Sequence, residues 1–531
     1  QLNIGQVPQL FFDNYAVEMT QSLTRRMHLP EKCPENPLIR QDRPWEVTTY
    51  FRTGTVCVAF DPDERLYKCW YCDYVWDYER YRSGKKEADG LMDVDDTVTW
   101  FGTTDNRWLY AESEDGIHWV KPELDYREID GRKTNICLGR EDYGQVHVAS
   151  FFLDALESDP DKRFKAFHYR QRGPDPRRSD HAEVSVAHSA DGRVWTTSER
   201  TVVVGQSGDR RFGDEMMILP DPVTGQYILN ARKRGMGDRL MFKDMPRHIE
   251  KNWEVPQFLH EPLLICKRRV FVTNSNSLWE WPTLRTLLTP DNEEDNIDEQ
   301  FYSLPIIRIG DLFIGFLNIL HCTDNTMNVQ LVYSRDGFHW ERAERGRTFL
   351  DVGSADADPW ERNLVEVGNT VVLGDDAIRI YYGGSACHHD WWMVGEEEGL
   401  DMPDEPGVCK TALGLATLRP EGFFSMDSTV RPALLLTRVF TSDGSRLVVN
   451  VECGPKGYLD VELTDASDRA VEGYEREACD TFTGDSTRHV VTWRGKSHLP
   501  REALAGGARL RFYSRHCSLY SFRMAADSES C

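Results

Sequence analysis

A short motif occurs three times in this chain and constrains its fold more than any other feature. The copies are Ser-Glu-Asp-Gly-Ile-His-Trp at 113–119, Ser-Ala-Asp-Gly-Arg-Val-Trp at 189–195 and Ser-Arg-Asp-Gly-Phe-His-Trp at 334–340. Each stands between strand-like runs, where Asp-Gly predicts a tight β-hairpin because both central residues of the turn need positive φ. A hairpin that recurs within one domain indicates a repeat architecture. We therefore expect a β-propeller, in which the active site lies on the axis where the innermost strands begin.

The repeats divide into five expected blades. Two further aromatic residues complete the hairpin series, Trp253 in a degenerate third-blade copy and Phe424 in the last turn. Each interval between successive hairpin aromatics has room for one blade, since a four-stranded blade needs at least about 40 residues. The expected blades begin near residues 45, 146, 213, 300 and 363. A long polar insertion over 77–105 follows the second strand of the first blade.

The pattern changes after about residue 427. From there, short apolar runs lie between turn signals, which is typical of a β-sandwich of about 95 residues. We therefore predict an all-β chain with a five-bladed β-propeller catalytic domain over 1–427, a β-sandwich domain over 428–524 and a flexible tail over 525–531. A length of 531 residues gives each domain enough chain for its own core.

The acidic composition narrows the classes of partner. A formal net charge of −24 repels phosphate backbones, so no nucleic-acid partner is expected. The sequence contains no run of about 18 apolar residues, so no membrane partner is expected either. The N-terminus lacks a signal-peptide pattern, and the 13 cysteines follow no disulfide framework. A cytoplasmic location is therefore favoured, while secretion after removal of a signal peptide, and a homo-oligomer, stay open.

Four of the five expected blade starts carry a carboxylate. Pro-Trp-Glu occurs at two of them, as 44–46 and 359–361, and Asp-Glu occurs at the other two, as 214–215 and 298–299. Glycoside cleavage uses two carboxylates, one to protonate the leaving oxygen and one to activate water or attack the anomeric carbon. Acids crowded on one axis raise the pKa of one of them, which gives a usable acid at neutral pH. The alternative for each is a loop or capping carboxylate on an acidic surface.

Other polar side chains are expected around the same funnel. Arginines there can bind a carboxylate or phosphate through two parallel hydrogen bonds, and a surface arginine is the alternative. His388 and His389 could help to hold a metal, but neighbours on a strand face opposite ways. We therefore predict no metal site and no required cofactor, and leave open one structural ion at the axis. The predicted substrate-binding residues are Trp45, His147, His168, Arg170, Arg232, Tyr302 and Glu361.

Five strings carry a resemblance to known enzymes: Leu-Phe-Phe-Asp-Asn-Tyr at 10–15, Pro-Trp-Glu at 44–46, Phe-Gly-Asp at 212–214, the hairpin copy at 334–340, and Gly-Leu-Ala-Thr-Leu-Arg-Pro-Glu-Gly-Phe at 414–423. With them the chain resembles bacterial glycoside hydrolase family 32-like and family 43-like proteins, in the arabinanase, levansucrase and invertase superfamily. This resemblance implies a five-bladed propeller with a C-terminal β-sandwich, and cleavage of an often furanosidic bond. By position it implies three catalytic acids, Glu46, Asp214 and Glu299.

The residues and the resemblance together predict an exo-acting glycoside hydrolase whose funnel is narrowed by the first-blade insertion. In this hypothesis Glu46 is the base or nucleophile, Glu299 the acid and Asp214 the residue that orients them. One alternative is a sialidase-like or phosphorolytic enzyme on an anionic sugar, with Tyr302 as a nucleophile candidate. Another is a non-catalytic carbohydrate-binding propeller. The sugar, the linkage and the stereochemical outcome stay open.

Overall fold

A computed structural model describes most of the chain, and almost all of the described part is β-structure. It covers residues 2–52, 54–76, 103–139, 149–171, 182–205, 215–234, 268–291, 293–296, 298–321, 323–353, 359–389 and 411–526. Within these ranges one short α-helix occurs, α7 (Arg501–Gly506), together with a few single-turn 3₁₀ helices. The all-β prediction is therefore confirmed for the described residues.

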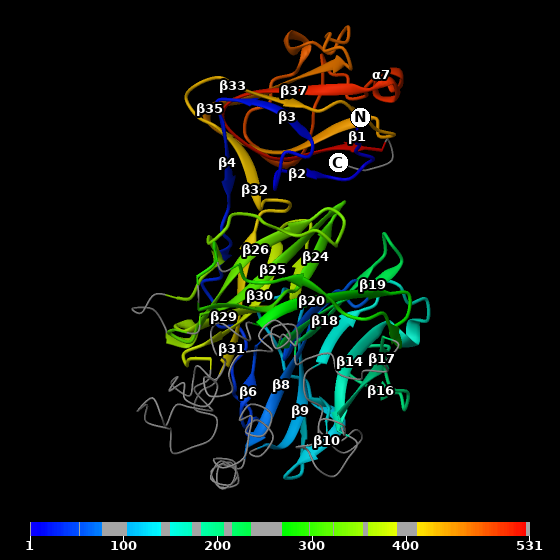
Figure 1. Cartoon of the computed structure of the whole chain (residues 1–531), viewed down its shortest axis with the longest axis vertical. Coiled ribbons are helices and arrows are strands. Elements are labelled where there is room, and N and C mark those ends of the chain that lie inside the picture. Colours follow the sequence, from blue (N-terminus) through cyan, green and yellow to red (C-terminus); the bar gives the residue numbers. More distant parts are fainter. Residues whose placement is uncertain are drawn as a thin grey trace, which may run out of the picture.

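Five antiparallel sheets make up the larger part of the described chain, and single parallel bridges join the first, fourth and fifth of them into one 15-stranded sheet (Figure 1). From the inside outward, the first three are β7 (Val56–Asp61), β8 (Leu66–Trp76), β9 (Thr103–Ser113) and β12 (Ile136–Leu138); β13 (Ala149–Leu153), β14 (Phe164–Gln171), β15 (Ala182–Ser189) and β16 (Thr196–Thr197); and β18 (Met216–Asp221), β19 (Gln226–Arg234), β20 (Arg268–Ser275) and β22 (Arg285–Leu288). Short strand β6 (Thr49–Tyr50) also pairs with β8.

The fourth and fifth sheets follow the same plan. In the fourth, β23 (Glu299–Ser303) and β24 (Ile306–Ile309) together form the inner strand, followed by β25 (Leu312–His321), β26 (Thr326–Ser334), β27 (Glu341–Arg342) and β28 (Thr348–Leu350). The fifth contains β29 (Leu364–Leu373), β30 (Ile378–Ser385), β31 (Thr411–Leu418) and β5 (Glu31–Lys32). Its outermost strand β5 therefore comes from the N-terminal part of the chain.

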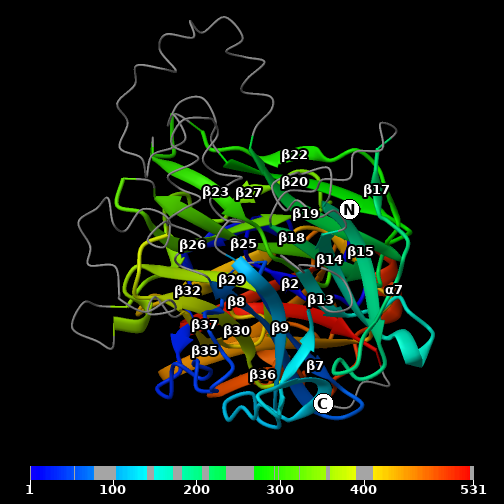
Figure 2. The same cartoon turned by 90° about the horizontal axis from the view of Figure 1, so that it is seen from below.

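The five sheets form a closed ring. Inner strand β7 contacts β13 and β29, β13 contacts β18, and β18 contacts β24. Where β7 and β29 touch, they run parallel, with Cys57 opposite Asn369. Viewed from below, the sheets surround a common centre (Figure 2). This arrangement is a five-bladed propeller, and β5 closes it by pairing with β31 through Lys32 and Ala416.

Apolar cores fill the spaces between neighbouring blades. Trp70 of the first blade stacks on Phe151 of the second, with ring centroids 5.4 Å apart and planes 6° from parallel. Aromatic and β-branched side chains suit such a packed, pleated surface, which explains the high aromatic content of the chain. Blades therefore depend on their neighbours for burial, as expected of a repeat fold.

The three repeated motifs are turns between the third and fourth strands of their blades, as predicted. In the first copy, Ser113 Oγ accepts a hydrogen bond from the Gly116 amide at 2.9 Å, and Asp115 Oδ1 accepts from the amides of Ile117 and His118, both at 2.8 Å. The other two copies repeat this pattern. Only the glycine of each copy takes positive φ. The prediction that the aspartate would also do so was wrong, because its side chain caps the turn instead.

Two of these turns also fasten one blade to the next. The Trp70 indole donates to the Gly192 carbonyl at 2.7 Å, and Tyr381 OH donates to the Gly116 carbonyl at 2.9 Å. A Cβ on Gly192 would lie 2.7 Å from the Trp70 ring, closer than such atoms come. Glycine is therefore required at 192 both for its φ of 75° and for this close approach.

Replacing Gly192 by alanine is expected to lower the free energy of unfolding by about 2–4 kcal/mol, from left-handed strain plus overpacking against Trp70. Gly225 is the matched control, since its φ is 69° but a Cβ there would meet no atom within 4 Å. Gly225→Ala should lower the free energy of unfolding by the left-handed strain alone, about 1 kcal/mol. Urea unfolding of both variants measures the difference, and equal losses would contradict the role of Trp70.

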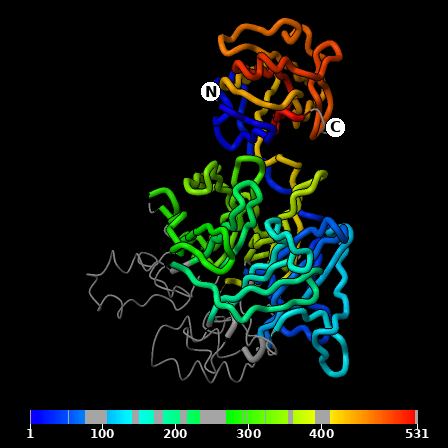
Figure 3. The backbone as a smooth tube through the Cα atoms, turned by 90° about the vertical axis from the view of Figure 1, so that its right-hand side faces the viewer, coloured from blue at the N-terminus to red at the C-terminus, as the bar shows by residue number. Residues whose placement is uncertain are grey.

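The C-terminal part forms a second body above the ring (Figures 1 and 3). Its strands form one hydrogen-bonded sheet of ten strands among the described residues: β1 (Leu2–Asn3), β2 (Gln9–Leu10), β3 (Val17–Gln21), β4 (Leu23–Met27), β32 (Phe424–Ser428), β33 (Ala433–Thr437), β34 (Phe440–Thr441), β35 (Arg446–Asp465), β36 (Asp485–Val490) and β37 (Ala508–Ala525).

This sheet differs from the predicted domain boundaries at its N-terminal end. The sequence prediction placed residues 1–427 in the propeller, but β1–β4 pair with β34, β37, β33 and β32 of the C-terminal sheet. Both ends of the chain therefore lie in the second body (Figure 3). Such long-range pairing leaves no local signal. Of the predicted tail, Ala525 ends β37, and residues 527–531 lie outside the described part.

Candidate functional site at the axial end of the propeller

Polar side chains from several blades gather around Tyr302. This residue lies in β23, and its ring has three arginines about it. The guanidinium carbons of Arg232, Arg268 and Arg52 lie 3.8, 5.4 and 5.9 Å from the ring centroid. The His389 ring meets Tyr302 edge-on at 4.9 Å. These residues belong to the first, third, fourth and fifth blades, so the cluster lies where the blades converge.

Arg52 is held by a buried ion pair. It is 5% exposed, its Nε donates to Oε1 of Glu366 at 3.0 Å, and Glu366 on inner strand β29 is 1% exposed. Nη1 of Arg52 also donates to the Tyr50 hydroxyl at 2.7 Å. Burial opposes the charge of Arg52, but Glu366 and Tyr50 outweigh it and keep the pKa of Arg52 well above its ordinary value. The cation is therefore permanent and fixed in position.

Three buried carboxylates stand at the starts of inner strands: Glu215 immediately before β18, Glu299 as the first residue of β23, and Glu366 near the start of β29. They are 8%, 4% and 1% exposed. Burial, followed by smaller contributions that include Glu366 and Glu215, raises the pKa of Tyr50 far above its ordinary value. The negative charges of Glu366 and Glu215 therefore both affect Tyr50, which lies beside Arg52.

Glu299 has its own support. The Asn296 side chain donates to Oε1 at 2.9 Å and the Asn296 amide donates to Oε2 at 3.3 Å, while His321 Nδ1 lies 4.0 Å from Oε1. The next residue, Gln300, accepts a hydrogen bond from Arg268 of the Tyr302 cluster at 3.0 Å. Buried carboxylates at the starts of inner strands are groups that can supply acid and base chemistry.

Glu46 lies elsewhere, in a network between the first and fifth blades. Its carboxylate accepts from the amides of Asp42 and Arg43 at 2.8 and 3.0 Å. It also accepts from Tyr71 OH and Lys121 Nζ, both at 2.7 Å. None of its four hydrogen-bond donors belongs to the Tyr302 cluster. The neighbouring Trp45 donates from its indole to Asn135 Oδ1 at 2.8 Å.

Glu361 repeats the Glu46 network one blade away. It accepts from Tyr382 OH at 2.7 Å and from Lys32 Nζ at 2.9 Å. As Tyr71 lies in β8, so Tyr382 lies in β30, the second strand of its own blade. The shared Pro-Trp-Glu string therefore marks a repeated structural network, and neither glutamate joins the Tyr302 cluster.

The structure brings two of the remaining predicted residues together. The guanidinium carbon of Arg232 lies 3.8 Å from the centroid of the Tyr302 ring. Asp214 and His147 lie outside the described residues, and Arg170 is described only as part of the backbone of β14. The sequence interpretation missed Arg52, Arg268 and Glu366, and it chose Asp214 rather than the adjacent Glu215. A usable signal existed for Glu366, since it is a single charge within the otherwise apolar start of strand Leu364–Leu373.

His168 is fully buried within its blade, away from the axis. Its Nε2 lies 3.1 Å from Thr197 Oγ1 on outer strand β16, and its Nδ1 lies 3.2 Å from the Tyr169 carbonyl. Burial lowers the pKa of His168 to about 4. The imidazole is therefore neutral in the folded protein at neutral pH, and it supports the second blade.

Acidification is expected to destabilise the fold through His168. The unfolded chain takes up this proton below about pH 6.5, whereas the folded protein resists until about pH 4, so stability falls across that interval by about 3 kcal/mol. Urea unfolding at several pH values measures the slope. His168→Asn keeps a polar group but cannot titrate. The variant should therefore lose less stability between pH 6.5 and 4 than the wild type does. Parallel pH profiles would show that another group dominates.

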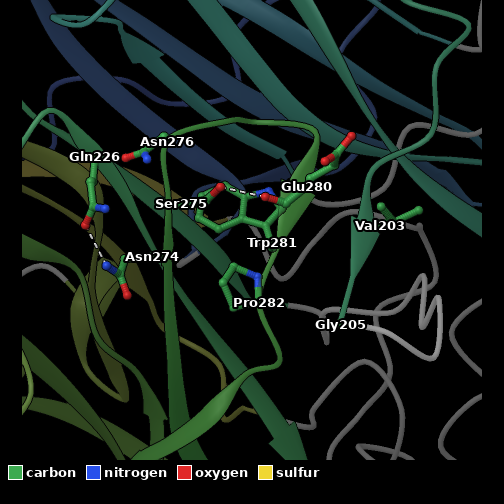
Figure 4. A pocket seen from close by; sticks show the side chains of 9 residues that line it. All are labelled: Val203, Gly205, Gln226, Asn274, Ser275, Asn276, Glu280, Trp281 and Pro282. Carbon is green, nitrogen blue, oxygen red and sulfur yellow. Dashed lines mark hydrogen bonds between the residues drawn. The ribbon is translucent and has the colours of Figure 1, made fainter.

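A pocket of about 530 Å³ lies at the outer edge of the third blade, beside the pairing of β17 (Val203–Val204) with β21 (Glu280–Trp281) (Figure 4). Asn274 donates to Gln226 at 2.6 Å in its wall. None of the predicted site residues lines it. Among the described residues no group of three or more His, Cys, Asp or Glu side chains is placed to hold a metal ion. No helix in the same ranges has the length and apolar character needed to cross a bilayer.

No protein-family model and no curated protein sequence matches the chain. The chain is similar in structure to a glycosyl hydrolase from Bacteroides ovatus, with 12% identity, TM-score 0.43, and 78% of this chain and 97% of that one covered. It is also similar to a β-1,2-mannobiose phosphorylase from Listeria innocua (12%, 0.41, 73% and 96%) and a family 43 arabinoxylan arabinofuranohydrolase from Bacillus subtilis (11%, 0.36, 94% and 99%). These TM-scores are too low to support an argument about the fold, so the five-bladed ring is inferred from the strand pairing of this structure alone.

Proposed function

We propose that this protein is a glycoside hydrolase that cleaves a glycosidic bond of an oligo- or polysaccharide at the axial end of its propeller. The observation that carries the proposal is the set of three buried carboxylates, Glu215, Glu299 and Glu366, at the starts of inner strands on three successive blades. Parallel inner strands bring their starts to one end of the ring. Paired acids at one site are the chemistry that glycoside cleavage requires.

The roles follow from the surroundings of each acid. Glu299, held at the start of β23 by the side chain and amide of Asn296, is the proposed proton donor to the leaving oxygen. Glu215 is the proposed base or nucleophile. Glu366, in a buried ion pair with Arg52, is the proposed group that orients the site and stabilises positive charge on the sugar ring. These assignments keep Glu299 from the sequence prediction and move the partner acid from Glu46 to Glu215.

The substrate is proposed to be a glycoside cleaved from its end, with a furanoside as the first choice because of the sequence resemblance. A panel of aryl furanosides, aryl pyranosides and plant, algal and bacterial polysaccharides tests this, with released sugar measured by chromatography. Release of a monosaccharide supports an exo-acting hydrolase. Saccharide binding by calorimetry without any product would instead favour a non-catalytic carbohydrate-binding propeller.

A second candidate is favoured by one observation, the three arginines around Tyr302. Guanidinium groups bind carboxylate and phosphate oxygens through paired hydrogen bonds. Such a site suits either an acidic sugar or cleavage by inorganic phosphate. Repeating the panel with and without phosphate separates the two, because phosphorolysis yields a sugar phosphate and needs the added anion, whereas hydrolysis of a uronic acid glycoside needs none.

A further inference from the structure

Two cysteines face each other in the C-terminal sheet. Cys453 in β35 lies directly opposite Cys517 in β37. Cys517 is 3% exposed, whereas Cys453 is half-buried. Both are thiols in this structure.

The backbone hydrogen bonds show which kind of cross-strand pair this is. The Cys453 amide donates to the Gly484 carbonyl at 2.7 Å, and the Cys517 amide donates to Ser428 Oγ at 3.1 Å. Neither amide therefore donates to the opposite cysteine. In an antiparallel ladder, such a non-hydrogen-bonded pair has the shorter separation, with Cα atoms about 4.5 Å apart and side chains close together. That separation lies within the range that a disulfide can span.

The strand register around the pair is firmly set. After Cys453, the next pairing in β35 is Tyr458 with Arg515, so four residues bulge out opposite His516. A Cβ on Gly457 would lie 2.3 Å from the His516 carbonyl oxygen, so only glycine allows the strands this close. On its other side β37 pairs with β32, where Cys517 lies opposite Ser428. The bulge and the pairing with β32 thus define the register that places Cys453 opposite Cys517.

We propose that Cys453 and Cys517 form a cross-strand disulfide when the protein meets a low-molecular-weight disulfide. The Cys453 thiolate attacks one sulfur of the oxidant, which forms a mixed disulfide and releases one thiolate. Cys517 then loses its proton and attacks the Cys453 sulfur, which forms the Cys453–Cys517 bond and releases the second thiolate. The two thiols lose two electrons and two protons, and the oxidant is reduced to two thiols.

The surroundings favour this order of attack. The contact with Cys517 lowers the pKa of Cys453, while that same contact and burial raise the pKa of Cys517. The half-buried Cys453 is thus both the better nucleophile and the accessible one.

Incubating the full chain with oxidised glutathione, followed by non-reducing digestion and mass spectrometry, tests the proposal. The expected product is one linked peptide pair containing Cys453 and Cys517, lighter than the two free peptides by two hydrogen atoms. The melting temperature of the C-terminal transition should rise by about 5–10 °C, because the bond closes a loop of more than sixty residues in the unfolded chain. A reductant should reverse both changes.

Cys453→Ser should abolish the linked peptide and the thermal shift while leaving the reduced protein folded. Cys479→Ser is the matched control, since Cys479 is another half-buried thiol of the same part of the chain and should leave both readouts intact. Two results would overturn the proposal. One is quantitative alkylation of Cys453 after oxidation, and the other is a stable glutathione adduct on Cys453 with Cys517 still free.

Discussion

Replacing Glu299 by glutamine is expected to lower kcat/KM by about 10²- to 10⁴-fold on any natural glycoside that the protein cleaves, because a general acid contributes about that much. Glutamine has the same shape and can still accept from Asn296, so the melting temperature should stay close to that of the wild type. The diagnostic measurement uses an aryl glycoside with a strongly activated leaving group. Such a group departs without protonation, so the loss should shrink to about tenfold or less if Glu299 is the acid.

Two companion variants separate the proposed roles. Glu215→Gln should impair activated and unactivated substrates alike, because the base or nucleophile is needed for both. Glu46→Gln should lower stability, since its carboxylate accepts four hydrogen bonds, and should leave kcat within a few-fold. If Glu46→Gln instead abolished turnover without a change in melting temperature, Glu46 would be a catalytic acid and the proposed assignment of that role to Glu215 would be wrong.

The propeller could be predicted because its signal is local and repeated. Each Ser-x-Asp-Gly turn is encoded within seven residues, and its strands follow within the same blade. The closure of the ring by Glu31–Lys32 could not be read in this way, because its partner strand Thr411–Leu418 lies nearly 400 residues later. The N-terminal strands that join the C-terminal sheet were missed for the same reason.

The candidate site was predicted in part. Tyr302 and Arg232 were identified because they fall at strand ends, where the propeller geometry directs them to the axis. Glu46 was chosen because the first blade was expected to start near Trp45, whereas inner strand β7 begins at Val56. Arg52, just before β7, was therefore overlooked. Composition and spacing carry no information on the ion pair between Arg52 and Glu366, since 314 residues separate them.

Arg52→Met is expected to lower the free energy of unfolding by about 3–5 kcal/mol. The substitution keeps most of the side-chain volume but removes the cation that faces Glu366, which is 1% exposed. A buried carboxylate deprived of its partner is far more costly than the intact pair is stabilising. Chemical unfolding monitored by tryptophan fluorescence, which follows the packed indoles of the propeller, measures the loss.

A double variant makes this prediction specific. Arg52→Met combined with Glu366→Met should recover most of the lost stability, because two apolar side chains replace two charges and neither charge is left alone. Arg26→Ala is the exposed control: its 3.6 Å pair with Asp427 has Arg26 64% exposed, so its loss should stay below about 1 kcal/mol. An Arg52→Met protein as stable as the wild type would contradict the contribution of the ion pair to the fold, whereas a stable but inactive double variant would show that the pair serves the chemistry as well as the fold.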